Sequence, residues 1–170
     1  MVEVKLFIAT SLDGFIAERD GGVDWLFTDN DYGYTSFFDS IETLIMGRRT
    51  YEQVLGFGEW PYGEKPTYVF TRGAPGGDHP HVEFLSSDAG PLVEELRRRS
   101  SGNIWLVGGA ALVSVFRKLH LIDEYILSVH PVLLGDGIPL FERPQPRESL
   151  RLREEVSFES GLVQLRYTVE

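Results

Sequence analysis

The stretch Trp105-Leu106-Val107-Gly108-Gly109-Ala110-Ala111-Leu112 decides the predicted fold. It starts as a hydrophobic strand, passes through two glycines and continues into an amphipathic helix. Four apolar residues of that helix recur at helical spacing and are expected to face a core: Leu112, Val115, Phe116 and Leu119. A strand, a glycine turn and a helix bring free backbone N–H groups and a positive dipole end to one point, which suits a phosphate group. A plain strand-to-helix turn would look the same, so the assignment depends on the rest of the chain.

A second strand-to-helix turn is predicted at Gly47-Arg48-Arg49-Thr50, directly after the apolar strand 43–46. Thr50 and Gln53 have the spacing of a capping box, which places Thr50 at the start of the helix. This turn therefore adds two guanidinium groups to a second helix N-terminus.

The remaining segments alternate between strand and helix patterns. Strands are predicted at 4–9, 67–70, 82–85 and 124–134, and helices at 35–41, with Thr35 or Ser36 as its cap, and after Asp88, with Arg97, Arg98 and Arg99 toward solvent. Two closing strands, 149–156 and 162–169, are expected to form an antiparallel hairpin. The pattern predicts one α/β domain over residues 1–170, with a mixed sheet that has an antiparallel edge.

Composition limits the partners that this chain can have. The 26 Asp and Glu residues exceed the 16 Lys and Arg residues, and the net charge of −10 disfavours binding to nucleic acid or to an anionic membrane surface. The chain has no cysteine, which excludes disulfides, thiolate catalysis and the zinc site of a nucleobase deaminase. No metal site is predicted. Neither a signal peptide nor a membrane-spanning stretch is recognisable, so we expect a cytoplasmic protein.

Taken together, the turns and strands resemble the dihydrofolate reductase superfold. The closer resemblance is to the C-terminal reductase domain of the bifunctional deaminase–reductase of riboflavin biosynthesis. The matching pieces are Ser11-Leu12-Asp13-Gly14, Val23-Asp24-Trp25, 44–51, Phe70-Thr71-Arg72, Val107-Gly108-Gly109 and 131–141. The Pro-Val-Leu-Leu-Gly run at 131–135 favours the riboflavin branch over classical dihydrofolate reductases.

The resemblance implies a three-layer fold whose mostly parallel sheet binds NADPH across its carboxyl ends. The implied cofactor-binding residues are Ala9 and Ile16 beside the nicotinamide, Gly47, Arg48, Arg49 and Thr50 at the pyrophosphate and adenosine side, Thr71 and Arg72 at the ribose 2′-phosphate, and Val107, Gly108, Gly109, Ala110 and Leu112 at the diphosphate. In relatives the Gly–Gly peptide is cis, and the same is expected for Gly108-Gly109.

Three arginines beside these turns favour NADPH over NADH, because a 2′-phosphate accepts charge-assisted hydrogen bonds. Two alternatives remain. Arg49 could point to solvent, and Arg72 could pair with a neighbouring acid.

The substrate side is predicted from fewer residues. Asp13 is the candidate for orienting the substrate or relaying a proton, or else it only forms the turn before Gly14. Trp25 would be a stacking wall of the site, or would pack its own loop. Asp24, Gly135 and Asp136 are expected to approach the substrate, although Asp-Gly turns are common.

The leading functional hypothesis is an NADPH-dependent oxidoreductase that transfers hydride to a small heterocyclic substrate, most like 5-amino-6-(5-phosphoribosylamino)uracil reductase. A dihydrofolate reductase is the second hypothesis. It is weakened because Asn30 stands where a folate-binding carboxylate is expected, and Glu64 and Lys65 stand where an arginine is expected. A non-catalytic NADPH-binding module is the third. The resemblance also implies a homodimer.

Overall fold

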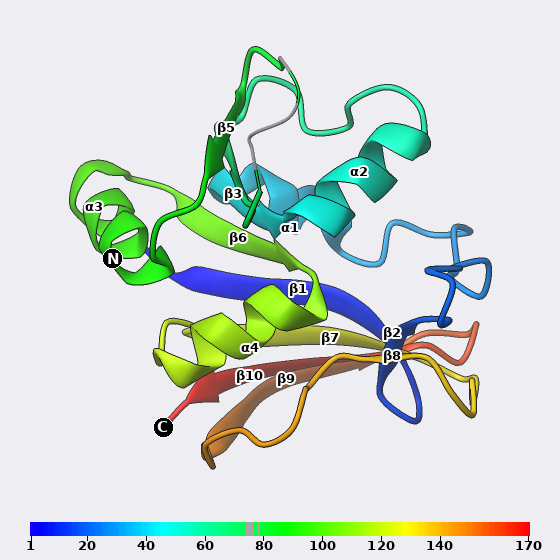
Figure 1. Cartoon of the computed structure of the whole chain (residues 1–170). Helices are drawn as coiled ribbons and strands as arrows, with labels where there is room; N and C mark the ends of the chain where they lie inside the picture. Colours follow the sequence, from blue (N-terminus) through cyan, green and yellow to red (C-terminus); the bar gives the residue numbers. More distant parts are fainter. Residues whose placement is uncertain (74–76, 78) are drawn as a thin grey trace.

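The computed structural model describes residues 1–73, 77 and 79–170. The helices and strands follow one another along the chain in the order β1 (Val4–Ser11), β2 (Phe15–Ala17), α1 (Tyr34–Asp39), β3 (Ile41–Gly47), α2 (Arg48–Gly56), β4 (Thr67–Phe70), β5 (Val82–Leu85), α3 (Ala89–Arg99), β6 (Asn103–Gly108), α4 (Ala110–Lys118), β7 (Glu124–His130), β8 (Ile138–Pro139), β9 (Leu150–Ser157) and β10 (Val163–Val169) (Figure 1).

The described residues form an eight-stranded sheet in the order β5-β4-β3-β6-β1-β7-β10-β9. Neighbours from β5 to β7 are parallel, whereas β10 is antiparallel to both β7 and β9. The predicted α/β sheet with an antiparallel edge hairpin is therefore confirmed. A two-stranded ribbon of β2 and β8, which we did not predict, joins the turn after β1 to the loop after β7.

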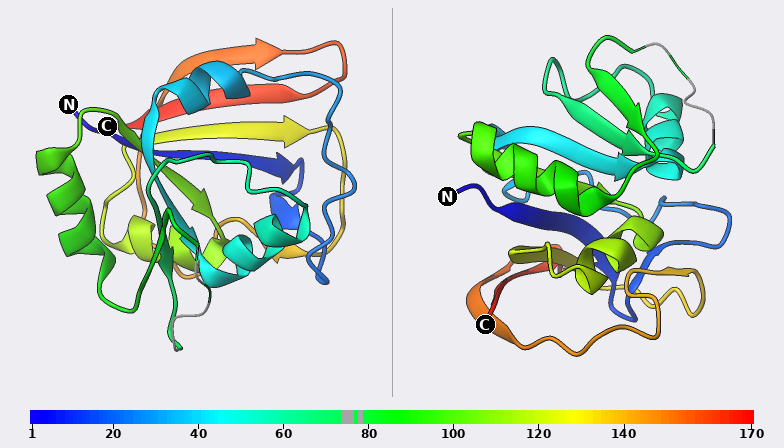
Figure 2. Two further views of the ribbon diagram at one scale, coloured as in Figure 1. Left: turned by 90° about the horizontal axis from the view of Figure 1, so that it is seen from above. Right: turned by 60° about the vertical axis from the view of Figure 1, so that its left-hand side comes forward.

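Helices cover both faces of the sheet and make a three-layer molecule (Figure 2). Phe116 and Val113 of α4 and Val93 of α3 belong to the core on one face. Phe37 of α1 and Val54 of α2 belong to the core on the other face. The apolar strands between them are buried on both sides, which explains their nearly continuous hydrophobic runs.

Helix α4 buries a different stripe from the one we predicted. Leu112 and Phe116 are buried as expected, but Val115 and Leu119 are 40% and 48% exposed. Val113, which is fully buried, takes their place against the sheet. The helix is short and ends at Lys118, so it contacts the sheet along a stripe of only two turns.

Four other sequence-based predictions are corrected. Helix α2 begins at Arg48 after an extended Gly47, so Thr50 lies inside the first turn and does not form a capping box with Gln53. Strand β7 ends at His130, before Pro131. The cap of α1 is Gly33 in a left-handed conformation, not Thr35 or Ser36.

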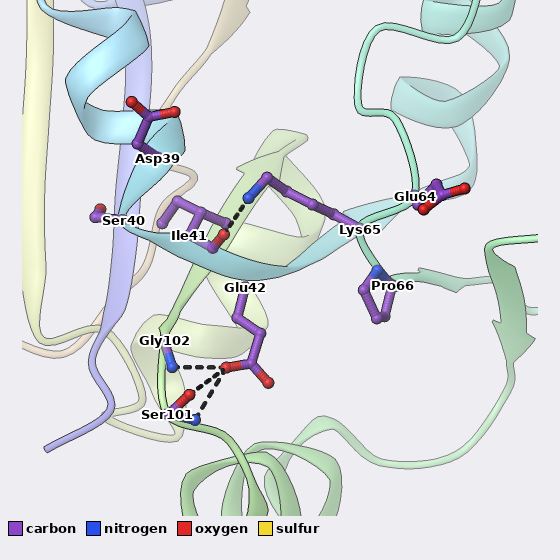
Figure 3. A pocket seen from close by; sticks show the side chains of 9 residues that line it. All are labelled: Asp39, Ser40, Ile41, Glu42, Glu64, Lys65, Pro66, Ser101 and Gly102. Carbon is purple, nitrogen blue, oxygen red and sulfur yellow. Dashed lines mark hydrogen bonds between the residues drawn. The ribbon is translucent and has the colours of Figure 1, made fainter.

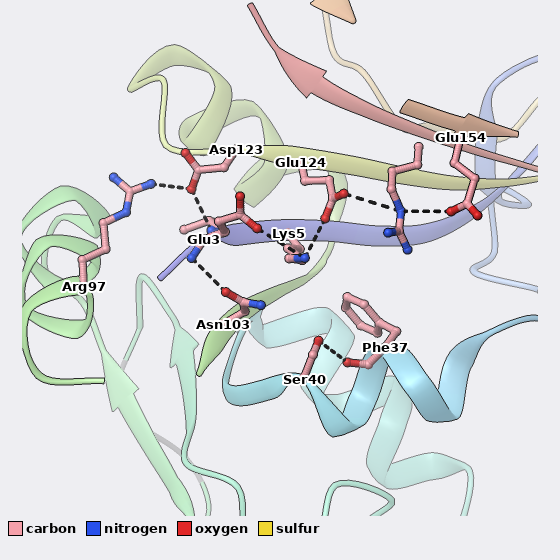
Figure 4. Close-up of polar contacts among 11 residues, drawn as sticks. Glu3, Lys5, Phe37, Ser40, Arg97, Asn103, Asp123, Glu124 and Glu154 are labelled. Carbon is pink, nitrogen blue, oxygen red and sulfur yellow. Dashed lines mark hydrogen bonds and ion pairs between the residues drawn. The ribbon is translucent and has the colours of Figure 1, made fainter. Parts of the chain in front are cut away.

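The fourth correction concerns the arginines at the end of α3. Arg97 donates to Asp123 at 2.6 Å (Figure 4), and Arg99 donates to the hydroxyl of Tyr68 at 2.6 Å. Arg98 and Arg99 are nevertheless exposed, as expected, and only Arg97 is partly buried. In the part of the chain that the structure describes, no helix has the length and apolarity to cross a bilayer.

Candidate functional site

The site lies where the connections of two neighbouring parallel strands diverge. From β3 the chain passes through α2 to β4, and from β6 it passes through α4 to β7 on the opposite side. The two helices pack on opposite faces of the sheet. The region outside the carboxyl ends of β3 and β6, called the crevice below, is where open α/β sheets with such a divergence bind their ligands.

Both glycine turns meet in this crevice. Met46 is paired with Gly108 across the two strands. A Cβ built on Gly47 would lie 3.7 Å from the amide nitrogen of Gly109, and a Cβ on Gly109 would lie 3.4 Å from Oγ1 of Thr50. The Gly108-Gly109 peptide is cis, as expected. The two turns, 61 residues apart in the sequence as counted from Gly47 to Gly108, therefore form one surface made of backbone.

Two helix N-termini point into that surface. Helices α2 and α4 each have nine residues, follow a glycine at the N-cap position and have no side-chain hydrogen bond at that cap. In α4 the first helical bond runs from the amide of Val113 to the carbonyl of Gly109 at 3.0 Å, so the preceding amides lack helical acceptors. Uncapped N–H groups and two positive dipole ends suit a diphosphate.

The cationic side of the crevice lies toward β4. Nη1 of Arg48 donates to Oγ1 of Thr71 at 3.4 Å, and Nε of Arg48 donates to Glu52 at 2.9 Å. The bond to Thr71 joins Arg48 of α2 to the end of β4, where Arg72 follows Thr71 and is exposed. Arg49, also exposed, is the next residue of α2. Arg48 and Arg72, which come from two separate stretches, are thus brought to the same end of β4.

The other predicted cofactor residues line the same end of the sheet or lie beneath it. Ala9 is on β1 opposite Ser128 of β7. Ile16 packs partly against the core below the crevice, and Val107 does so on the other face. Ala110 and Leu112 are buried at the start of α4, so their side chains face the protein interior.

Asp13 ties together the two loops on the substrate side. Its carboxylate accepts hydrogen bonds from the hydroxyl of Ser11 at 2.6 Å and from the amides of Leu134 at 3.2 Å and Gly135 at 2.9 Å. The Ser11 bond, with the backbone bonds, holds the pKa of Asp13 below its usual range. The group is therefore an ionised acceptor at neutral pH, which favours an orienting role over that of a proton donor.

Asp136 and Asp24 differ in their surroundings. Asp136 forms an ion pair with Arg19 and accepts from the amide of Gly137 at 2.9 Å. The Arg19 pair lowers the pKa of Asp136. Asp24 lies in the loop between β2 and α1 and is exposed. Sequence reasoning missed Arg19, whose ion pair joins the loop after β2 to the loop after β7.

Trp25 packs on His130, a residue that the sequence analysis did not single out. The Trp25 ring meets His130 edge-on at 5.2 Å between centroids, and its Nε1 is buried without a hydrogen-bond partner among the described residues. His130 is 3% exposed, contacts the carbonyl of Ser128 through Nδ1 at 3.0 Å and accepts from the amide of Phe27 at Nε2. Nε2 can accept only in a neutral ring protonated at Nδ1. These contacts favour the loop-packing alternative for Trp25.

Gln53, which the sequence predicted as part of a capping box, instead makes a tertiary hydrogen bond. Its side-chain amide donates to the carbonyl of Gly21 at 3.0 Å. The bond joins α2 to the loop after β2. No sequence signal identified it, because the partner is a backbone atom 32 residues away.

Two cavities lie away from this crevice. One of about 530 Å³ opens at the amino ends of β3, β4 and β6, where Glu42 accepts from Ser101 and Gly102 and Lys65 donates to the carbonyl of Ile41 (Figure 3). The other, of about 370 Å³, adjoins Tyr32 and the turn between β9 and β10. Among the described residues, no group of three His, Asp or Glu is arranged to hold a metal ion.

Comparison with known proteins agrees with this geometry. Residues 59–163 match the model of the RibD C-terminal domain. The chain belongs to the RibD C-terminal domain family. Over 166 residues, and 95% of each chain, it is 42% identical to the protein YwjB of Bacillus subtilis (strain 168).

Solved structures support the same family and fold. A protein from Shewanella sp. PV-4, provisionally named for riboflavin biosynthesis, superposes with a TM-score of 0.90 at 28% identity over 99% of both chains. The Thermotoga maritima diaminohydroxyphosphoribosylaminopyrimidine deaminase/5-amino-6-(5-phosphoribosylamino)uracil reductase superposes with a TM-score of 0.75 at 18% identity. That match covers 99% of this chain and 57% of the Thermotoga chain, so it shows a shared fold with part of a longer protein.

Proposed function

We propose that this family member is an NADPH-dependent reductase that transfers hydride to a small heterocyclic substrate. The observation that carries the proposal is the meeting of Gly47 with Gly108-Gly109 between two uncapped helix N-termini. Family membership supports an oxidoreductase. The cofactor is inferred from the crevice itself.

The residues of the crevice fit a dinucleotide phosphate. A side chain on Gly109 would contact Thr50 and fill the space between the turns, so a glycine keeps the backbone open to a close ligand. Gly47, Gly108 and Ala110 would hold the diphosphate through backbone N–H groups. Arg48, Arg49 and Arg72 would hold the 2′-phosphate. Bound NADPH supplies the hydride, while the protein supplies orientation and electrostatics.

The substrate would lie beside the end of β1. There Asp13 fixes the loop that carries Gly135, and Asp136 is fixed through Arg19. Ala9 and Ile16 would border the nicotinamide, and Trp25 would support the substrate side through its contact with His130. We place the substrate in the class of the ribosylamino pyrimidines, as the Thermotoga relative's name suggests for that protein.

The decisive experiment is a titration of the protein with NADPH and, separately, with NADH, monitored by tryptophan fluorescence. Preferential binding of NADPH supports the proposal, and binding of neither overturns it. The loss of NADPH absorbance is then measured with 5-amino-6-(5-phosphoribosylamino)uracil and with dihydrofolate. Oxidation with the pyrimidine supports the proposed substrate class, whereas oxidation with dihydrofolate alone assigns a folate reductase. Tight binding without oxidation indicates a non-catalytic module.

A further inference from the structure

His130 ends strand β7 at the carboxyl edge of the sheet and is 3% exposed. It is paired with Ser11 of the neighbouring strand β1. The rings of Trp25 and Phe27 lie with their centroids 5.2 Å and 4.9 Å from that of the imidazole. Both aromatic residues belong to the segment 23–30, called the Trp25 loop below. The imidazole is therefore buried between the sheet and the Trp25 loop.

Each nitrogen of the imidazole has one backbone partner. Nδ1 lies 3.0 Å from the carbonyl oxygen of Ser128, and Nε2 lies 3.2 Å from the amide nitrogen of Phe27. A carbonyl oxygen can only accept and an amide N–H can only donate, so the ring must carry its proton on Nδ1 and a lone pair on Nε2. The surrounding backbone thus selects one tautomer of the neutral ring.

The bond to His130 is a principal attachment of the Trp25 loop. Within the described part of the chain, the amide of Phe27 makes the one hydrogen bond between residues 23–28 and the strands of the sheet. The next attachment lies beyond the loop, where Gln164 of β10 donates to the carbonyl of Tyr32 at 3.0 Å. Loss of the Phe27 bond would therefore leave the first part of the loop held by packing alone.

A protonated imidazole would have no counter-ion at this position. The ion pairs of the described residues include one histidine, His120 with Glu148, and none of them includes His130. The segments around His130 carry five carboxylates, each of which is exposed or bonded to another group. Asp13 accepts from Ser11, Asp29 from Tyr32 and Asp31 from Thr35, and Asp24 and Glu159 are exposed.

Protonation would act on the loop in two ways. It would place an N–H on Nε2 opposite the N–H of Phe27, where two donors face each other. It would also bury a charge without a partner, which is costly. Both costs disappear when the loop moves away and water reaches the ring. The released loop then binds one more proton than the docked loop, so a lower pH favours release.

We propose that His130 is a positioning residue: its neutral ring holds the Trp25 loop against the sheet, and protonation of the ring releases the loop. Histidine ordinarily changes its charge between about pH 5 and pH 8, so the release belongs to that range. For the reaction, the inference rests on the proposed function, because the Trp25 loop matters to catalysis only if it borders a substrate. The docking of the loop itself can be measured without cofactor or substrate.

Amide hydrogen exchange of the intact protein, followed by NMR, tests the docking. The protection factor of the Phe27 amide should fall about tenfold or more between about pH 7.5 and pH 5.5, because release is linked to the uptake of one proton. The amide of Leu140, which donates to the carbonyl of Gly14 at 3.0 Å away from the imidazole, should keep its protection. Nitrogen NMR of the ring should show the proton on Nδ1 at neutral pH.

Three variants separate this role from general stability. His130→Gln keeps a side-chain oxygen that can accept from Phe27 and does not titrate, so protection should persist at both pH values. His130→Phe keeps a buried ring without an acceptor, so protection should be low at both. His120→Gln removes a histidine whose side chain is 65% exposed and should keep the pH dependence of the wild type.

Three results would overturn the proposal. They are a protection factor of Phe27 that is independent of pH in the wild type, the same pH dependence in His130→Gln, and a neutral ring protonated on Nε2. The second result would mean that another group titrates.

The proposed function fails separately. If the protein reduces the pyrimidine, its KM for that substrate should rise about tenfold from about pH 7.5 to pH 5.5 in the wild type and not in His130→Gln. The Kd for NADPH should change equally in both proteins. Absence of NADPH binding would refute the reductase assignment alone, since the exchange experiment uses the protein without ligands.

Discussion

At the scale of single residues, the crevice depends on a few side-chain contacts, among them the hydrogen bond between Arg48 and Thr71. The hydroxyl of Thr71 accepts a hydrogen bond from Arg48, and Arg72 is the next residue in the chain. The exposed position of Arg72 leaves its guanidinium available to a phosphate group. This arrangement makes cofactor preference testable by one substitution.

Arg72→Ala should raise the Kd for NADPH by about tenfold or more while changing the Kd for NADH less than about twofold. The reason is that a charge-assisted bond to a 2′-phosphate exists only with NADPH. Fluorescence titration measures both constants, with Arg98→Ala as a matched control. Equal losses for both cofactors would place the 2′-phosphate elsewhere.

Gly109→Val should reduce NADPH affinity by about a hundredfold or more, because its side chain would stand between Gly109 and Thr50 in the diphosphate space. The circular dichroism spectrum should remain that of the wild type. Gly90→Val is the control, since a Cβ at that helical glycine meets nothing within 4 Å. Unchanged affinity in the Gly109 variant would mean that the glycine turn is only structural.

The lowered pKa of Asp13 gives a pH-dependent prediction. A carboxyl whose pKa is lower in the folded state stabilises that state above its unfolded pKa and loses the effect as pH falls through the folded pKa. Protection of the Leu134 and Gly135 amides should therefore hold above about pH 4 and decline below it. Hydrogen exchange measures this protection.

Asp13→Asn should raise exchange at these two amides already at neutral pH, by about fivefold. Asp24→Asn is the control and should leave exchange at these amides unchanged, since Asp24 is exposed in a different loop. Unchanged exchange in Asp13→Asn would mean that other contacts hold the loop after β7.

At the scale of elements, α4 packs against the sheet through a narrow stripe of apolar side chains. Phe116 is fully buried against the sheet, while its neighbour Val115 is 40% exposed. Phe116→Ala should lower the free energy of unfolding by about 3–5 kcal/mol, and Val115→Ala by less than about 1 kcal/mol. Chemical denaturation compares the two, and equal losses would contradict the observed orientation of the helix.

The elements also explain which site residues the sequence could indicate. Gly47, Thr71 and Gly108 each end a parallel strand or follow one directly, so strand patterns alone placed them at one edge of the sheet. Gln53 and His130 could not be found in this way. Their roles depend on partners 32 and 103 residues away, Gly21 and Phe27, whose positions are set by loops.

At the scale of the whole molecule, cofactor binding is linked to stability. A ligand that binds only the folded chain at a hundred times its Kd stabilises it by about 2.7 kcal/mol. For a chain of this size, saturating NADPH should raise the Tm by about 5–10 °C. Calorimetry with NADPH and with NADH at equal concentration measures the difference, and no shift with NADPH would contradict the proposed cofactor.

Three things followed from the sequence by itself: the α/β class, the antiparallel closing hairpin and the two glycine turns. They could be predicted because hydrophobic periodicity, strand ends and glycines act over a few neighbouring residues. The tertiary structure alone decided that Val113 and not Val115 faces the sheet, that Asp13 holds Leu134 and Gly135, and that His130 supports Trp25. Those outcomes depend on packing and hydrogen bonds between distant segments, which no local pattern encodes.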